Sequence, residues 1–76
     1  MTYALLASLH VGDSVQLSTA SRPMKELFRV IAIERDVDEL GTPLPGLSHP
    51  RTIRIHARRI NVRDSVMPSL FFATEG

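Results

Sequence analysis

The chain has 76 residues, nine basic and eight acidic side chains, no cysteine, and a formal net charge of +1. This length predicts one small domain, residues 1–76, with a small core, and the lack of cysteine excludes disulfides and thiolate chemistry. The near-neutral charge argues against a protein held on nucleic acid by bulk charge alone. Any site for anions must therefore come from local clustering of basic residues.

Residues 1–10 form an N-terminal arm of undecided conformation. Leu5, Leu6 and Leu9 fit one face of a helix, whereas alternate residues from Tyr3 to Leu9 fit one face of a strand. A short helix and a docked arm therefore both remain open. The start lacks the basic region of a secretory signal, and no apolar run is long enough to span a bilayer. We expect a cytoplasmic protein that does not bind membranes.

Two strands are predicted in the first half of the chain. Gly12 and Asp13 indicate a turn, and the alternation in residues 14–18 predicts a short strand with Val15 and Leu17 facing inward. Residues 27–33 are β-branched and almost continuously apolar, which predicts the main strand with both faces covered.

A long loop is predicted at residues 36–50, where three prolines and two glycines exclude a long helix or a central strand. We expect it to be the most disordered internal segment. Its carboxylates, Asp36, Asp38 and Glu39, do not match a calcium-binding loop, because leucine stands at two positions that need oxygen ligands. They indicate a solvated acidic turn instead.

The sequence of residues 51–63, RTIRIHARRINVR, holds five of the nine basic residues and no acid. Alternate apolar residues predict a strand over residues 52–57, but Ile60 and Val62 fall out of phase with it. We therefore expect a bulge or a one-turn helix at residues 57–59, followed by a short strand that begins at Ile60.

The C-terminal segment, residues 64–76, carries an apolar cluster after Pro68. We expect it to close a barrel, to cover an edge strand or to contact a partner. The cluster consists of Met67, Leu70, Phe71 and Phe72.

The order of short strand, long strand, long loop, strand, tight turn and short strand predicts a mainly β fold. It suits a small, five-stranded, partly open SH3-like barrel.

The run Val11–Gly12–Asp13–Ser14–Val15–Gln16–Leu17, with Pro23 and Met24 after the loop, resembles the opening of the short bacterial YodC-like proteins. The resemblance covers residues 11–24 and implies a small β-barrel. The chain lacks that family's glycine pair in the loop and its downstream tryptophan and cysteine. Residues 52–56, followed by a turn and an apolar strand, also resemble a strand of phage head–tail joining proteins.

The leading functional hypothesis is a non-enzymatic module that binds a polyanion, either nucleic acid or an acidic protein surface. Guanidinium groups suit phosphate and carboxylate, but no aromatic residue lies in the basic stretch to stack on a base. The alternative is that these residues only face solvent, partly neutralised by the acids of the 36–50 loop. The candidate partner-binding residues are Arg54, His56, Arg58, Arg59 and Arg63.

A second hypothesis is an oligomeric assembly protein of phage or mobile-element type that uses Met67, Leu70, Phe71 and Phe72 as its interface. The sequence contains no nucleophile motif, glycine-rich phosphate loop or metal-ligand spacing among its three histidines. We therefore expect no enzymatic activity, no metal, no cofactor and no small-molecule substrate.

Overall fold

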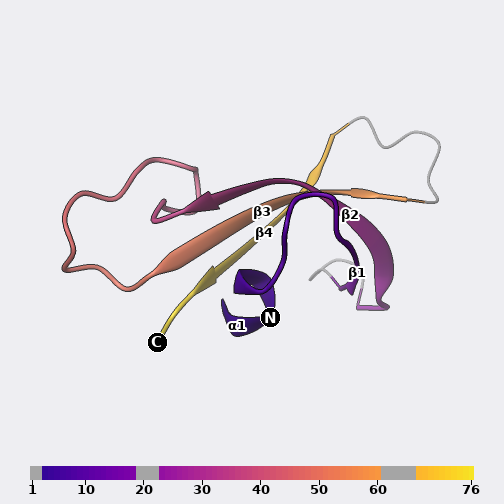
Figure 1. The fold of residues 1–76 in the computed structure, drawn as a ribbon, viewed down its shortest axis with the longest axis horizontal. Helices are drawn as coiled ribbons and strands as arrows, with labels where there is room; N and C mark the ends of the chain where they lie inside the picture. Colours follow the sequence, from indigo (N-terminus) through magenta and orange to yellow (C-terminus); the bar gives the residue numbers. More distant parts are fainter. Residues whose placement is uncertain (1–2, 19–22, 61–66) are drawn as a thin grey trace.

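The computed structural model describes residues 3–18, 23–60 and 67–76. These ranges contain a helix, α1 (Tyr3–Ala7), and four strands: β1 (Ser14–Leu17), β2 (Glu26–Arg35), β3 (Thr52–Arg59) and β4 (Ser69–Thr74). The strands pair antiparallel in the order β1-β2-β3-β4, so they form an open sheet with β1 and β4 at its edges (Figure 1). The mainly β prediction is confirmed, but the described residues show neither a fifth strand nor closure into a barrel.

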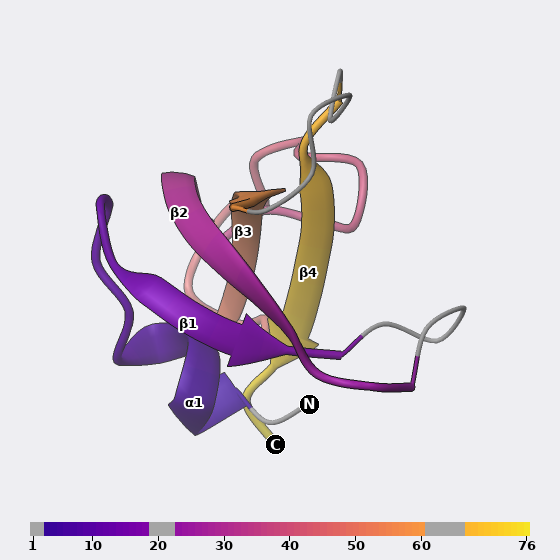
Figure 2. The same cartoon turned by 90° about the vertical axis from the view of Figure 1, so that its right-hand side faces the viewer.

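One face of the sheet, here called the inner face, packs against α1, which contacts β3 and β4 (Figure 2). Leu6 is completely buried there, so the helix is the correct one of the two conformations considered for the N-terminus. The helix is only five residues long, and helices this short are not stable alone. Burial of its apolar side chains against the strands is therefore what holds it in place.

The hydrophobic core is a single layer between α1 and the inner face. Phe28 and Phe71 meet edge to face, with ring centroids 5.2 Å apart and an interplanar angle of 80°, a geometry that aromatic pairs prefer. The inward positions of Val15 and Leu17 in β1, predicted from alternation, are confirmed, with Val15 partly buried at the margin. The core residues are Leu6, Leu9, Leu17, Phe28, Val30, Ile53, Ile55, Ala57, Phe71 and Ala73.

β2 is covered on its inner face alone, so the prediction that both of its faces are buried is wrong. Leu27 and Ile31 point to the opposite, outer face, where each is 37% exposed. The continuous apolar run has another cause, because the β2–β3 register shifts between Val30 and Ala32. This β-bulge inserts one residue and changes which residues face inward: Phe28 and Val30 do so before it, and Ile33 does so after it.

β3 continues without a break to Arg59, so the predicted bulge or one-turn helix at residues 57–59 is wrong. The break was inferred from the assumption that Ile60 must face the core. Ile60 is instead an exposed turn residue whose N–H donates to the carbonyl of Leu27 (3.0 Å). Arg59 takes the next inward position at the end of the sheet, where it meets Glu26 at 3.4 Å. The rest of the strand expected from Ile60 onward lies outside the described residues.

The connection between β2 and β3 projects beyond the ends of the strands, away from β1 (Figure 1). Its first part, which we expected to be disordered, carries a defined set of hydrogen bonds. Asp36 adopts a left-handed conformation (φ 56°), a region that aspartate tolerates better than most residues. The Leu44 N–H then donates to the Asp36 carbonyl (2.9 Å), and Val37 bridges to Pro43. The chain thereby folds back over the end of β3.

Candidate functional site

The outer face of the sheet is the candidate functional surface, because α1 packs on the opposite side and no other described helix covers it. Strand alternation sends Arg54, His56 and Arg58 of β3 outward. Ile53, Ile55 and Ala57 fill the core. Register then decides their neighbours: Arg54 lies opposite Glu34, and Arg58 lies opposite Arg29. The first half of β3 therefore faces a carboxylate group on β2, and its last residues face a guanidinium group.

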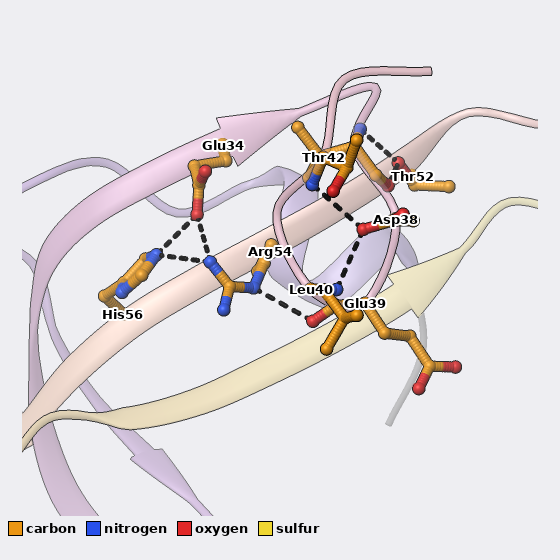
Figure 3. A network of polar contacts seen from close by, with 9 residues as sticks. Glu34, Asp38, Glu39, Leu40, Thr42, Thr52, Arg54 and His56 are labelled. Carbon is orange, nitrogen blue, oxygen red and sulfur yellow. Dashed lines mark hydrogen bonds and ion pairs between the residues drawn. The ribbon is translucent and has the colours of Figure 1, made fainter.

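Glu34, Arg54 and His56 form a compact polar group, the Glu34 cluster (Figure 3). Arg54 Nη1 lies 2.6 Å and His56 Nε2 2.5 Å from the same oxygen, Glu34 Oε1. An ionised carboxylate only accepts hydrogen bonds, so His56 Nε2 must carry the proton and donate. The 3.3 Å approach of Arg54 Nη1 to His56 Nε2 is then a contact between two donors, held together by the shared carboxylate.

The carboxyl group of Glu34 is stabilised in its charged form. The hydrogen bond from His56, and then that from Arg54, lowers the pKa of Glu34 below its ordinary value, against a smaller opposing effect of burial. Hydrogen bonds and positive charges that favour the anion have this direction of effect. The Glu34 cluster thus holds an ionised carboxylate that neutralises the guanidinium beside it.

The loop after β2 closes over the guanidinium of Arg54. Arg54 Nε donates to the Glu39 carbonyl (3.2 Å), while Asp38 Oδ1 accepts from the Leu40 and Thr42 N–H groups, both at 2.9 Å (Figure 3). Gly41 (φ 86°) lies so close that a Cβ there would stand 2.8 Å from Arg54 Nη1. Only glycine fits both this conformation and this approach. The Asp38 carboxylate therefore shapes the turn. Among the described residues, the acids of the loop form no ion pair with an arginine, which is the contact that the alternative hypothesis assumed.

Thr52 fixes the start of the same loop. Its side chain is buried, and Oγ1 accepts from the Val37 N–H (2.9 Å) and donates to the Val37 carbonyl (2.5 Å). Both backbone groups of a buried residue are thus satisfied by one hydroxyl, which avoids the cost of leaving them unpaired. The Glu34 cluster and this contact together make the loop end of β3 a structural unit in which Glu34, Thr52, Arg54 and His56 each have a hydrogen-bond partner.

The other end of the outer face is different. Arg29 and Arg58 are both exposed and lie directly opposite each other on β2 and β3; we call them the arginine pair. Neither guanidinium group has a hydrogen bond or an ion pair within the described part of the chain. Directly opposed side chains in antiparallel strands have Cβ atoms about 5 Å apart, and like charges at that spacing are destabilising. The pair is therefore positioned to hold an anionic group.

The five predicted partner-binding residues do not form one stripe. Arg54 and His56 are on the outer face but are engaged by Glu34, and Arg58 is on the outer face and free within the described part of the chain. Arg59 lies toward the inner face near Glu26, and Arg63 lies outside the described residues. Of the five, Arg58 alone is shown as an exposed cation without a partner among those the structure describes.

Sequence reasoning missed Arg29 and Glu34 of β2. These two residues make the environments of Arg54 and Arg58 on β3 different. Both lie outside the arginine-rich stretch, so local composition did not point to them. The available signal was the spacing of large apolar residues in β2: Phe28, Val30 and Ile33 are separated by two and then three positions. That change of phase marks a β-bulge, and the bulge places Glu34 on the same face as Arg29.

The predicted interface residues of the C-terminal segment also separate. Phe71 belongs to the core, and Phe72 is partly buried on the outer face opposite Arg54. Leu70 is 50% exposed and Met67 80% exposed. The segment therefore does two things: it completes the core through alternate residues, and as β4 it pairs with β3 and becomes an edge of the sheet itself.

The loop also contains a hollow of about 450 Å³. His49 Nδ1 donates to the Pro50 carbonyl (2.8 Å), so that nitrogen is already used. No group of three or more metal-ligating side chains occurs among the described residues. The hollow thus contains no such metal-ligating group among its described residues. Its lining residues are Asp36, Leu44, Gly46, Leu47, His49 and Arg51.

No protein-family model, curated protein or solved structure matches the chain. The resemblances to YodC-like proteins, to SH3-like barrels and to phage joining proteins therefore stay predictions. Among the residues that the structure describes, no helix has the length and apolar character needed to cross a membrane. Inference about function thus rests on the outer face of the sheet.

Proposed function

We propose that the protein is a non-enzymatic binding module that holds a polyanionic partner on the outer face of its sheet, through the arginine pair. The supporting observation is the direct opposition of Arg29 and Arg58, two exposed guanidinium groups with no partner among the described residues. An anion between them converts a repulsive pair into two attractive ones, and the planar forks of arginine suit phosphate and carboxylate oxygens.

The surroundings of the pair support contact with an extended partner. Ser14 lies opposite Arg29 on β1 and is exposed, so its hydroxyl continues the same row across the sheet. Leu27 and Ile31 flank the row with exposed apolar surface. A polymer that offers anionic groups and apolar surface fits this face. Nucleic acid and an acidic polypeptide both have these properties. The two differ in how strongly their binding depends on salt and in their absorption spectra.

Binding is best measured by fluorescence anisotropy at low salt, with a labelled 20-nucleotide single strand, a 20-base-pair duplex and polyglutamate as probes. The decisive variant is Arg29→Ala/Arg58→Ala. The matched control is Arg35→Ala, which removes an exposed arginine from β2 on the opposite side, since its cross-strand partner is the buried Ile53. Removing a repulsive surface pair should leave the fold intact, and circular dichroism checks this.

We expect the wild-type chain to bind one of these polymers and the double variant to lose that binding, while Arg35→Ala retains it. For duplex DNA, two neutralised phosphates predict a slope of about −1.8 in the logarithm of affinity against the logarithm of salt concentration. Absence of binding to all three probes at low salt contradicts the proposal. So does an equal loss in the Arg35→Ala control, because that result would show a response to net charge alone.

A further inference from the structure

The outer edge of β4 is a second surface that the structure leaves open. β4 is the last strand in the sheet order, and no described strand lies beyond it. Its sequence, SLFFAT, contains no charge and no proline, and its register with β3 runs without a bulge. Natural proteins usually block an edge with lysine, proline, a bulge or a very short strand. The opposite edge, β1, follows that rule because it has only four residues.

Hydrogen-bond geometry shows which groups of β4 are available. The Glu75 N–H donates to the Arg51 carbonyl on the β3 side (2.7 Å). Because the backbone groups of successive residues in a strand point to opposite sides, those of Ser69, Phe71 and Ala73 also point to β3. Those of Leu70, Phe72 and Thr74 point away from it, to the free edge.

We infer that β4 pairs with β4 of a second copy of this chain, antiparallel and about a two-fold axis that passes between the two Phe72 residues. This register sets Phe72 opposite itself and Leu70 opposite the second copy's Thr74. It uses all three outward residues of each strand, and each opposed pair exchanges two hydrogen bonds. Shifting the axis by one residue in either direction leaves one outward residue of each strand without a partner in the other copy's β4.

The strand is suited to pairing with itself rather than with a charged peptide. Its uncharged side chains create no like-charge contact when the strand meets its own copy. Leu70 and Phe72 lie on the outer face, so pairing continues one exposed apolar strip across the axis. A chain of 76 residues buries a smaller fraction of its surface on folding than a larger domain does, so association adds to its stability. The inference does not depend on the arginine pair.

Pairing would also give the outer face a definite symmetry. A two-fold axis between antiparallel edge strands stands perpendicular to the sheet, so both outer faces point the same way. The two arginine pairs would then lie on one side of a continuous eight-stranded sheet. A long polyanion could contact both at once, with the gain in affinity that two linked sites provide.

The test is the molar mass in solution, measured by light scattering and sedimentation over a range of concentrations, with charge variants that report on register. We expect a mass of two chains for the wild type. Leu70→Lys/Thr74→Lys sets like charges opposite each other twice and should weaken the dimer about tenfold or more. Leu70→Lys/Thr74→Glu carries the same lysine but sets opposite charges across the axis, so it should remain a dimer.

Both substituted side chains are exposed, so the monomer fold should persist, and circular dichroism of each variant confirms that. A wild type that stays monomeric at millimolar concentration overturns the inference. A dimer that is equally stable in both charge variants also overturns the inference, because the interface would then lie elsewhere. If dimers form as expected while all three probes for the arginine pair fail to bind, only the proposed function is wrong.

Discussion

Arg54 and Arg58 lie four residues apart on the same strand and the same face, yet their environments are opposite. Arg54 is 14% exposed, donates to Glu34 at 2.6 Å, and is covered by the loop after β2. Arg58 is exposed and faces Arg29. The difference shows that the residue across the strand, rather than the local density of arginine, decides whether a guanidinium group is structural or free to bind.

The β-bulge in β2 produces this difference. Without the extra residue, Glu34 would share the inner face with Phe28 and Val30, and the guanidinium of Arg54 would lack its carboxylate partner. With it, Glu34 lies opposite Arg54. Bulges commonly redirect a side chain in this way. Here the bulge separates a neutralised end of the outer face from a cationic end.

The largest expected effect is on stability, when Thr52→Val removes the contact between the start of β3 and the loop after β2. The substitution keeps the shape of the side chain but leaves the buried N–H and carbonyl of Val37 without the hydroxyl that satisfies both. We expect the free energy of unfolding to fall by about 2 kcal/mol, measured by urea unfolding with circular dichroism. Thr42→Val, at an exposed position in the same loop, is the control and should change little. Equal stabilities of the two variants would show that the Thr52 contact does not hold the loop.

The second-largest expected effect is on the pH dependence of stability, in the variant Glu34→Gln. The pKa of Glu34 is lowered in the folded state by the hydrogen bonds from His56 and Arg54, so its contribution to stability is fully present above the ordinary carboxyl pKa. That contribution is lost as the pH falls through the lowered pKa, when the carboxylate becomes protonated. Glutamine keeps the shape and removes the titration.

We therefore expect the stability of the wild type to decline more steeply in acid than that of Glu34→Gln, with the two curves converging at low pH. Unfolding midpoints in urea from pH 7 down to pH 2 measure this. Parallel curves over the whole range would mean that Glu34 titrates alike in the folded and unfolded chains, and the two hydrogen bonds would then contribute nothing. Glu39→Gln is a suitable control, because that side chain is exposed.

The strands could be predicted from the sequence where one apolar phase persists. Alternation placed Val15 and Leu17 in β1, and Ile53, Ile55 and Ala57 in β3, correctly on the inner face. Alternation fails where the apolar phase changes or ends: it predicts burial of both faces where β2 has a bulge, and it predicts a core position for Ile60. A pattern of single residues cannot show whether a strand end is covered, because that depends on what packs against it.

The candidate site was less predictable than the fold. Arg58 could be found from composition, but its partner Arg29 comes from another strand 29 positions earlier and is brought there by register. The same holds for Glu34, whose charge cancels that of Arg54. Local sequence gives the number of charges in a stretch, whereas pairing across strands decides which remain unpaired.

The smallest expected effect is also the most direct test of the comparison between the two arginines. Arg54→Met and Arg58→Met make the same chemical change on one strand and one face, and methionine keeps the apolar stem of arginine. Arg54→Met loses its bonds to Glu34 and to the Glu39 carbonyl, so unfolding free energy should fall by about 1 kcal/mol.

Arg58→Met should change the free energy of unfolding by about 0.5 kcal/mol or less, in the stabilising direction, because it removes the repulsion from Arg29. Differential scanning calorimetry at low salt gives the sign most clearly, since added salt screens that repulsion and should bring the variant and the wild type together. A loss of stability in Arg58→Met as large as that in Arg54→Met would mean that Arg58 also has a structural partner. The distinction between an engaged and a free arginine, on which the proposed binding face rests, would then be lost.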